Sequence, residues 1–134
     1  MSSEQNVDWN EIEQLIKILS KKILKLQRSF QSITTLSRGG LVPSRLLADH
    51  LGIKKIYVDK KKISASSLFV DDIFDTGTSF KKILPKVDDV SQLVFVTLFA
   101  RQGKKYPKQL VYAKQTIDNG YVVFPWDKLE FQRT

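Results

Sequence analysis

The chain has 134 residues, of which 42% are hydrophobic and 27% are charged, as is typical of one globular domain. It contains no cysteine, which excludes disulfides and thiolate metal sites, and its apolar runs are too short to span a bilayer. The net charge of +8 favours anionic partners, but the basic residues are spread along the chain, which argues against a nucleic-acid-binding module.

The first predicted element is a helix over residues 8–28. Its apolar residues recur at spacings of three and four, and they are Trp9, Ile12, Leu15, Ile16, Leu19, Ile23 and Leu26. Asp8 is expected to cap this helix, with Glu11 at the capping-box position. The stripe predicts a helix docked on a core, and the alternative is a basic helix on a membrane surface.

A strand over residues 30–36, a glycine-containing loop and a helix over residues 41–51 are expected next. The loop is Ser37-Arg38-Gly39-Gly40, where paired glycines allow backbone N–H groups to approach a ligand closely. Such a loop is often only a turn, but Arg38 favours an anion site. Pro43 in the first helical turn and Gly52 past the end agree with the helix, and residues 54–58 predict another strand.

The most informative stretch is residues 68–79, LFVDDIFDTGTS. A buried strand is expected at residues 68–70, and a helix is expected from Phe80 onward. The carboxylates and hydroxyls between them therefore lie where open α/β sheets bind ligands. Free N–H groups there suit a phosphate, and the carboxylates suit a divalent metal, ribose hydroxyls or a proton in transit. The stretch predicts a site for a phosphorylated sugar.

The remainder of the chain continues the alternation of strands and helices. Pro85 is expected to end or kink the helix, and Asp88-Asp89 to form a turn. Strands are expected at residues 92–100 and 110–113, and residues 121–126 form either a stacking platform for a flat ligand or a last strand that closes the core. We expect an α/β fold in three layers, with a mainly parallel sheet of about five strands flanked by helices.

Two of these motifs carry a family resemblance. Residues 68–79 resemble the ribose-phosphate signature of the type I phosphoribosyltransferases, with two acids, two apolar residues, an acid, and then Thr-Gly and small hydroxyl residues. Residues 37–43, SRGGLVP, resemble the pyrophosphate loop of the purine branch, in particular the xanthine-guanine (hypoxanthine) enzymes. Similarities at residues 7–9, 95–100 and 125–127 extend the resemblance over about residues 7–127.

The resemblance implies purine salvage. A purine base and 5-phosphoribosyl-1-pyrophosphate (PRPP) would give a nucleoside 5′-monophosphate and pyrophosphate, with Mg²⁺ as cofactor. Asp71 and Asp72 match the acids that hold the ribose hydroxyls and the metal, with Asp72 as the metal ligand. Asp75 matches the general base. The 5′-phosphate loop would comprise Asp75, Thr76, Gly77, Thr78 and Ser79.

The resemblance also implies the two other parts of the site. The pyrophosphate would be bound by Ser37, Arg38, Gly39 and Gly40, and the purine by Arg101, Tyr121 and Val122. Arg101 stands where the branch usually has a lysine that donates to the 6-oxo group, and arginine has a larger, planar set of donors. Residues 1–134 would form a single domain with a small purine-binding hood over about residues 101–127.

The sequence departs from the family between two strands. The family has a mobile loop there that closes over the reacting centre, whereas only residues 59–67 separate Val58 from Leu68. The alternatives are therefore a non-catalytic or weakly active relative that binds PRPP or a nucleotide, and, on charge alone, a nucleic-acid-binding module. We expect a cytoplasmic homodimer or homotetramer without membrane contact, with Phe124, Trp126 and Phe131 either at an interface or in the core.

Overall fold

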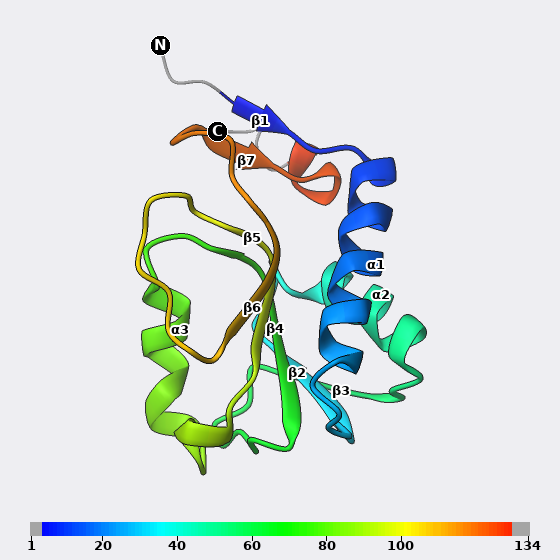
Figure 1. The fold of residues 1–134 in the computed structure, drawn as a ribbon, viewed down its shortest axis with the longest axis vertical. Helices are drawn as coiled ribbons and strands as arrows, with labels where there is room; N and C mark the ends of the chain where they lie inside the picture. The colour runs from blue at the N-terminus through cyan, green and yellow to red at the C-terminus, as the bar shows by residue number, and fades with distance from the viewer. Residues whose placement is uncertain (1–3, 130–134) are drawn as a thin grey trace.

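The computed structural model describes residues 4–129. Its centre is a sheet with the strand order β3-β2-β4-β5-β6, in which all neighbouring strands run parallel. The strands are β2 (Ser32–Thr35), β3 (Lys55–Val58), β4 (Ser67–Phe74), β5 (Phe95–Ala100) and β6 (Leu110–Gln115). Helices lie on both faces of this sheet, which confirms the predicted three-layer α/β fold (Figure 1).

The two faces of the sheet have separate cores. Helices α1 (Trp9–Leu24) and α2 (Leu41–Leu51) cover one face, and α3 (Thr78–Ile83) covers the other, followed by the 3-10 helices η1 (Leu84–Lys86) and η2 (Val90–Gln92). Along β4, Leu68 and Val70 face the first core and Phe69 faces the second, because successive side chains of a strand alternate. None of the described helices is long and apolar enough to cross a membrane.

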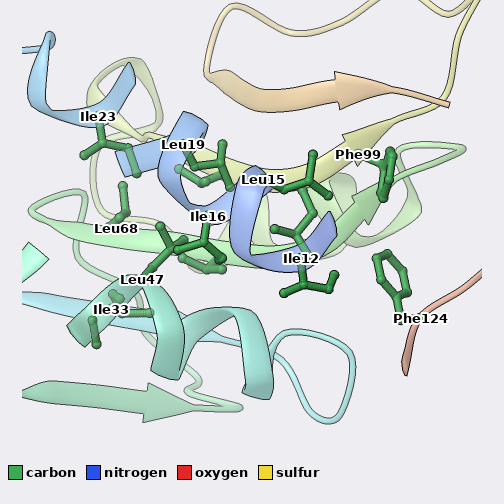
Figure 2. Packing of buried hydrophobic residues seen from close by; sticks show 14 of the residues in the cluster. Ile12, Leu15, Ile16, Leu19, Ile23, Ile33, Leu47, Leu68, Phe99 and Phe124 are labelled. Carbon is green, nitrogen blue, oxygen red and sulfur yellow. The ribbon is translucent and has the colours of Figure 1, made fainter. Parts of the chain in front are cut away.

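The middle of the predicted apolar stripe packs on the sheet, whereas its two ends, Trp9 and Leu26, are 56% and 39% exposed. Figure 2 shows its side chains reaching toward the strands, and five of them are at most 2% exposed: Ile12, Leu15, Ile16, Leu19 and Ile23. The Asp8 carboxylate caps the helix, because the backbone N–H of Glu11 donates to it at 2.8 Å. The predicted end at residue 28 is wrong. The helix ends at Leu24, and Gln27 has a φ of 55°, which a helix does not accommodate.

A small second sheet lies beyond the carboxyl ends of the main strands. It pairs β1 (Glu4–Asn6) with β7 (Tyr121–Val123) in parallel, followed by the 3-10 helix η3 (Pro125–Asp127). Phe124 is 1% exposed and stacks on Trp126, with ring centroids 4.8 Å apart. Phe124 therefore belongs to the core, as the second interpretation of residues 121–126 predicts. Phe131 lies outside the described residues.

The short connection between β3 and β4 is anchored to the body of the protein. Ile63, in its middle, is 3% exposed. Its backbone N–H donates to the Lys86 carbonyl at 2.9 Å, and its carbonyl accepts from the Asp88 N–H at 3.1 Å. The Asp88 carboxylate also accepts from the Ala65 N–H at 2.8 Å. Residues 59–66 thus pack beside η1 in the structure.

Candidate active site

Strand β4 is longer than predicted and includes the acid pair. The predicted strand stops at residue 70, whereas β4 continues to Phe74, so Asp71 and Asp72 are strand residues. The apolar pair Ile73-Phe74 extends the ladder to β5, where Ile73 lies opposite Phe99. The helix also begins earlier than predicted, at Thr78 instead of Phe80. The loop proper is therefore short, and it begins at Asp75.

A cavity of about 430 Å³ lies at this edge of the sheet. Most of the predicted site residues line it, namely Ser37, Gly39, Asp71, Asp72, Asp75, Thr76, Gly77, Thr78 and Ser79. Its lining in the described part of the chain does not include five others, which are Arg38, Gly40, Arg101, Tyr121 and Val122. The structure thus gathers the acid pair, the predicted phosphate loop and part of the predicted pyrophosphate loop around one cavity.

The two adjacent carboxylates are electrostatically strained against each other. Asp71 is 7% exposed, and burial raises the pKa of its carboxyl above the ordinary range. Burial, followed by the charge of Asp71, raises the pKa of Asp72 to about 8. Each accepts a backbone hydrogen bond, Asp71 from the Asp72 N–H at 2.9 Å and Asp72 from the Ile73 N–H at 2.8 Å. A divalent cation would relieve this repulsion.

An Asp72→Asn variant should be more stable than the parent at alkaline pH in metal-free buffer. The folded pKa of Asp72, about 8, lies above the value of 3.8 expected in the unfolded chain. Its contribution to stability is therefore fully present below pH 3.8 and is lost as the pH rises through 8. Urea unfolding at pH 9 should show a gain of about 1–3 kcal/mol, the ordinary cost of an uncompensated buried group. A gain of the same size at pH 4 would mean that asparagine acts through packing.

Close packing leaves no room for a side chain at either glycine of the predicted pyrophosphate loop. A β-carbon on Gly39 would lie 2.7 Å from Oδ2 of Asp72, so only glycine allows this loop to approach the acid pair so closely. A β-carbon on Gly40 would lie 1.8 Å from Oγ1 of Thr35 and 2.7 Å from the Val70 carbonyl oxygen. Gly39 therefore shapes the cavity, and Gly40 closes the contact between the loop and the sheet. The Ser37–Arg38 peptide, which lies between the end of β2 and the two glycines, is cis.

Two charged residues that line this cavity are absent from the sequence-based prediction of the site. Asp59 follows β3, and its carboxylate accepts from the Ser37 N–H at 3.0 Å and from the Ser37 hydroxyl at 2.5 Å. These hydrogen bonds hold the pKa of Asp59 below its usual range. Lys82 of α3 also lines the cavity and supplies a positive charge. The signal for Asp59 was its place at the carboxyl end of a strand, the edge where ligands bind.

The predicted phosphate loop offers hydroxyls and backbone N–H groups at the cavity wall. Gly77 has a φ of 85°, a conformation that favours glycine and turns the chain sharply. The hydroxyls of Thr76 and Thr78 lie 2.7 Å apart and share a hydrogen bond. Asp75 opens the loop with a carboxylate that is half-exposed. This set of donors suits an anion such as a phosphate.

Of the three residues predicted to bind the purine, Arg101 and Val122 are buried and Tyr121 is exposed. Arg101 follows β5, and its buried guanidinium pairs with Asp75, with Nε 3.0 Å from Oδ1. Tyr121 is 57% exposed, whereas Val122 is 6% exposed and lies opposite Gln5 in the small sheet. The structure therefore brings Arg101 to the predicted general base and leaves Tyr121 exposed on the small second sheet.

The donors present are compatible with Mg²⁺. Within residues 4–129 there is no cluster of three or more His, Cys, Asp or Glu side chains that could hold a metal by themselves. Mg²⁺ is commonly bound through one or two carboxylates, with its remaining positions filled by water and substrate oxygens. Asp71 and Asp72 therefore suit a metal that arrives with a phosphorylated substrate.

Comparison with known proteins points to the family that the two motifs resemble. No protein-family profile matches the chain. A curated relative, the xanthine-guanine phosphoribosyltransferase of Chromohalobacter salexigens, is 25% identical over 140 residues, which cover 90% of this chain and 82% of the relative.

Solved structures share the fold. A purine phosphoribosyltransferase from Pyrococcus horikoshii matches with a TM-score of 0.73 and 21% identity, over 92% of this chain and 93% of its own. The xanthine-guanine-hypoxanthine phosphoribosyltransferase of Helicobacter pylori matches with a TM-score of 0.72 and 17% identity, over 98% of this chain and 100% of its own. Sequence relatives and fold together support a type I phosphoribosyltransferase of the purine branch.

Proposed function

Starting from its kinship with the type I phosphoribosyltransferases of the purine branch, we propose that this chain transfers 5-phosphoribosyl from PRPP to a 6-oxopurine. The base would be guanine, xanthine or hypoxanthine, and the products a nucleoside 5′-monophosphate and pyrophosphate. The observation that carries the proposal is the single cavity shared by Ser37, Asp72 and the loop from Asp75. These are the parts that a substrate with a ribose, a 5′-phosphate and a pyrophosphate requires.

The proposed binding mode follows from the donors and acceptors of the cavity. The N–H groups and hydroxyls of the loop from Asp75 to Ser79 would hold the 5′-phosphate. The pyrophosphate would lie along residues 37–40, near the positive charge of Lys82. Asp71 and Asp72 would accept hydrogen bonds from the ribose hydroxyls and would hold Mg²⁺, which would neutralise charge on the leaving pyrophosphate.

The proposed reaction is a displacement at the ribose carbon that bears the pyrophosphate. A ring nitrogen of the purine forms the new bond to that carbon as the carbon–oxygen bond breaks. Pyrophosphate departs with the electron pair, and the proton of the attacking nitrogen passes to Asp75 as general base. The hood over residues 101–127, with Tyr121 and Val122, would cover the purine.

The test is product formation by the purified protein with PRPP, Mg²⁺ and each of the three bases. We expect the monophosphate of at least one base, and PRPP binding with Mg²⁺ is measured in parallel by calorimetry. PRPP binding without any product would favour the second candidate, a relative that binds PRPP or a nucleotide without turning it over. The observation behind that candidate is the anchored connection of residues 59–66, which leaves little chain to close over the cavity.

A further inference from the structure

The side chain of Arg101 is committed to contacts within the protein. Nε and Nη2 lie 3.0 Å and 3.4 Å from the two carboxylate oxygens of Asp75. Nη1 donates to two carbonyl oxygens, that of Asp118 at 3.0 Å and that of Gly120 at 2.9 Å. The side chain of Arg101 is 9% exposed, whereas that of Asp75 is 50% exposed. This guanidinium is therefore enclosed and has its partners already.

These contacts limit what Arg101 offers to a ligand. Of the five N–H groups on a guanidinium, the four contacts leave one, on Nη2. To reach a purine oxygen with its other donors, the side chain would have to leave Asp75 or the two carbonyl groups. The backbone of Arg101 is fixed as well, because its N–H donates to the Phe74 carbonyl at 2.8 Å.

The turn of residues 118–120, whose carbonyl groups Arg101 contacts, is itself held together by hydrogen bonds to Asp118. The Gly120 N–H donates to the Asp118 carboxylate at 2.7 Å, and the Thr116 hydroxyl donates to the Asp118 carbonyl at 3.1 Å. The turn leads directly into Tyr121 and Val122, the residues proposed to cover the purine. One guanidinium thus joins the general base of the phosphate loop to the start of the purine-binding strand.

We propose that Arg101 is a positioning residue that fixes Asp75 and the turn of residues 118–120 relative to each other, and that it does not itself recognise the purine. This inference rests on the proposed function for the role of Asp75 as general base. The contacts of Arg101 do not depend on that function. A lysine at this position would have a single ammonium, which cannot span both carboxylate oxygens and both carbonyl groups. The arginine therefore performs a task that the usual lysine of the branch cannot.

The first test needs no turnover. Hydrogen–deuterium exchange is measured on the ligand-free protein and on its Arg101→Lys and Arg101→Gln variants. We expect exchange in peptides covering residues 116–122 to be at least tenfold faster in both variants, with α1 unchanged. Arg45→Lys and Arg45→Gln are the matched controls, because Arg45 pairs with Asp49 at 3.2 Å on the exposed side of α2. Exchange in residues 116–122 equal to that of the parent would overturn the proposal.

The second test separates positioning from recognition. In Arg101→Lys, which keeps the charge, we expect kcat to fall at least tenfold and KM for PRPP to rise, because both Asp75 and the phosphate loop lose their support. A rise confined to KM for the 6-oxopurine would instead identify Arg101 as a purine reader. If no base yields product with the parent protein, the proposed function fails, while the exchange experiment still decides the role of Arg101.

Discussion

Replacing Gly40 with alanine should lower the free energy of unfolding by at least about 3 kcal/mol, the upper end of the ordinary cost of overpacking. The new β-carbon would lie 1.8 Å from Oγ1 of Thr35 and 2.7 Å from the Val70 carbonyl oxygen. The Thr35 hydroxyl cannot step aside freely, because it donates to that same carbonyl at 2.5 Å. Thr35 and Val70 are both fully buried in the centre of the sheet. Urea unfolding followed by circular dichroism measures the loss.

Gly39→Ala is the matched control, one residue away in the same loop. Its β-carbon would meet the carboxylate end of Asp72, which borders the cavity and not the packed sheet. We expect this variant to fold with a loss of less than about 1 kcal/mol, since the conflict is with the end of one side chain. It should nevertheless bind PRPP with Mg²⁺ more weakly. Equal stability of Gly40→Ala and the parent would show that the loop does not pack on β2 and β4 as described.

A second variant identifies the cause of the Gly40→Ala defect. Thr35→Ala removes the hydroxyl that the new methyl group meets at the shortest distance. Combined with Gly40→Ala, it should recover part of the lost stability, because only the Val70 carbonyl would remain in close contact. Additive losses in the double variant would mean that the two residues do not interact.

The elements of the main sheet could be predicted because their signals are local. Strand β5 is buried throughout and apolar except for Thr97, and α2 is bounded by Gly40 and by Gly52 at a φ of 70°. The sequence also predicted that the acid pair and the loop from Asp75 lie together at the carboxyl end of the sheet, and they line one cavity there. In a parallel sheet, the carboxyl ends of all strands meet there, so the order of the strands hardly affects that prediction.

The contacts that complete the site join residues far apart in the chain, and no local pattern shows them. The side-chain partners of Arg101 are 26, 19 and 17 residues away, at Asp75, Gly120 and Asp118. Strand β1 is too short to have a periodicity of its own, and it forms because β7 lies beside it. Likewise, nothing in the local sequence marks Asp59 as a partner of Ser37. The two residues meet only because β3 pairs with β2.

Replacing Asp75 with asparagine should reduce kcat by about 10²–10⁴-fold, the usual contribution of a positioned general base. The amide keeps a carbonyl oxygen that can face Arg101, where the carboxylate oxygen now lies 3.0 Å from Nε. It cannot accept a proton from the purine. KM for PRPP should therefore stay within about threefold of the parent value, because the phosphate loop keeps its support. Steady-state kinetics with both substrates varied measures both constants.

Asp49→Asn is the control for loss of a carboxylate, because Asp49 pairs with Arg45 on the exposed side of α2. It should leave both constants unchanged. A parallel loss of kcat and of PRPP affinity in Asp75→Asn would instead give Asp75 a purely structural role.

The pH dependence of kcat also tests whether Asp75 accepts the purine proton. A purine that has already lost its ring proton needs no acceptor, so the deficit of Asp75→Asn should shrink as the pH rises toward deprotonation of the free base. A deficit in kcat that does not change with pH would mean that a group other than Asp75 accepts the purine proton.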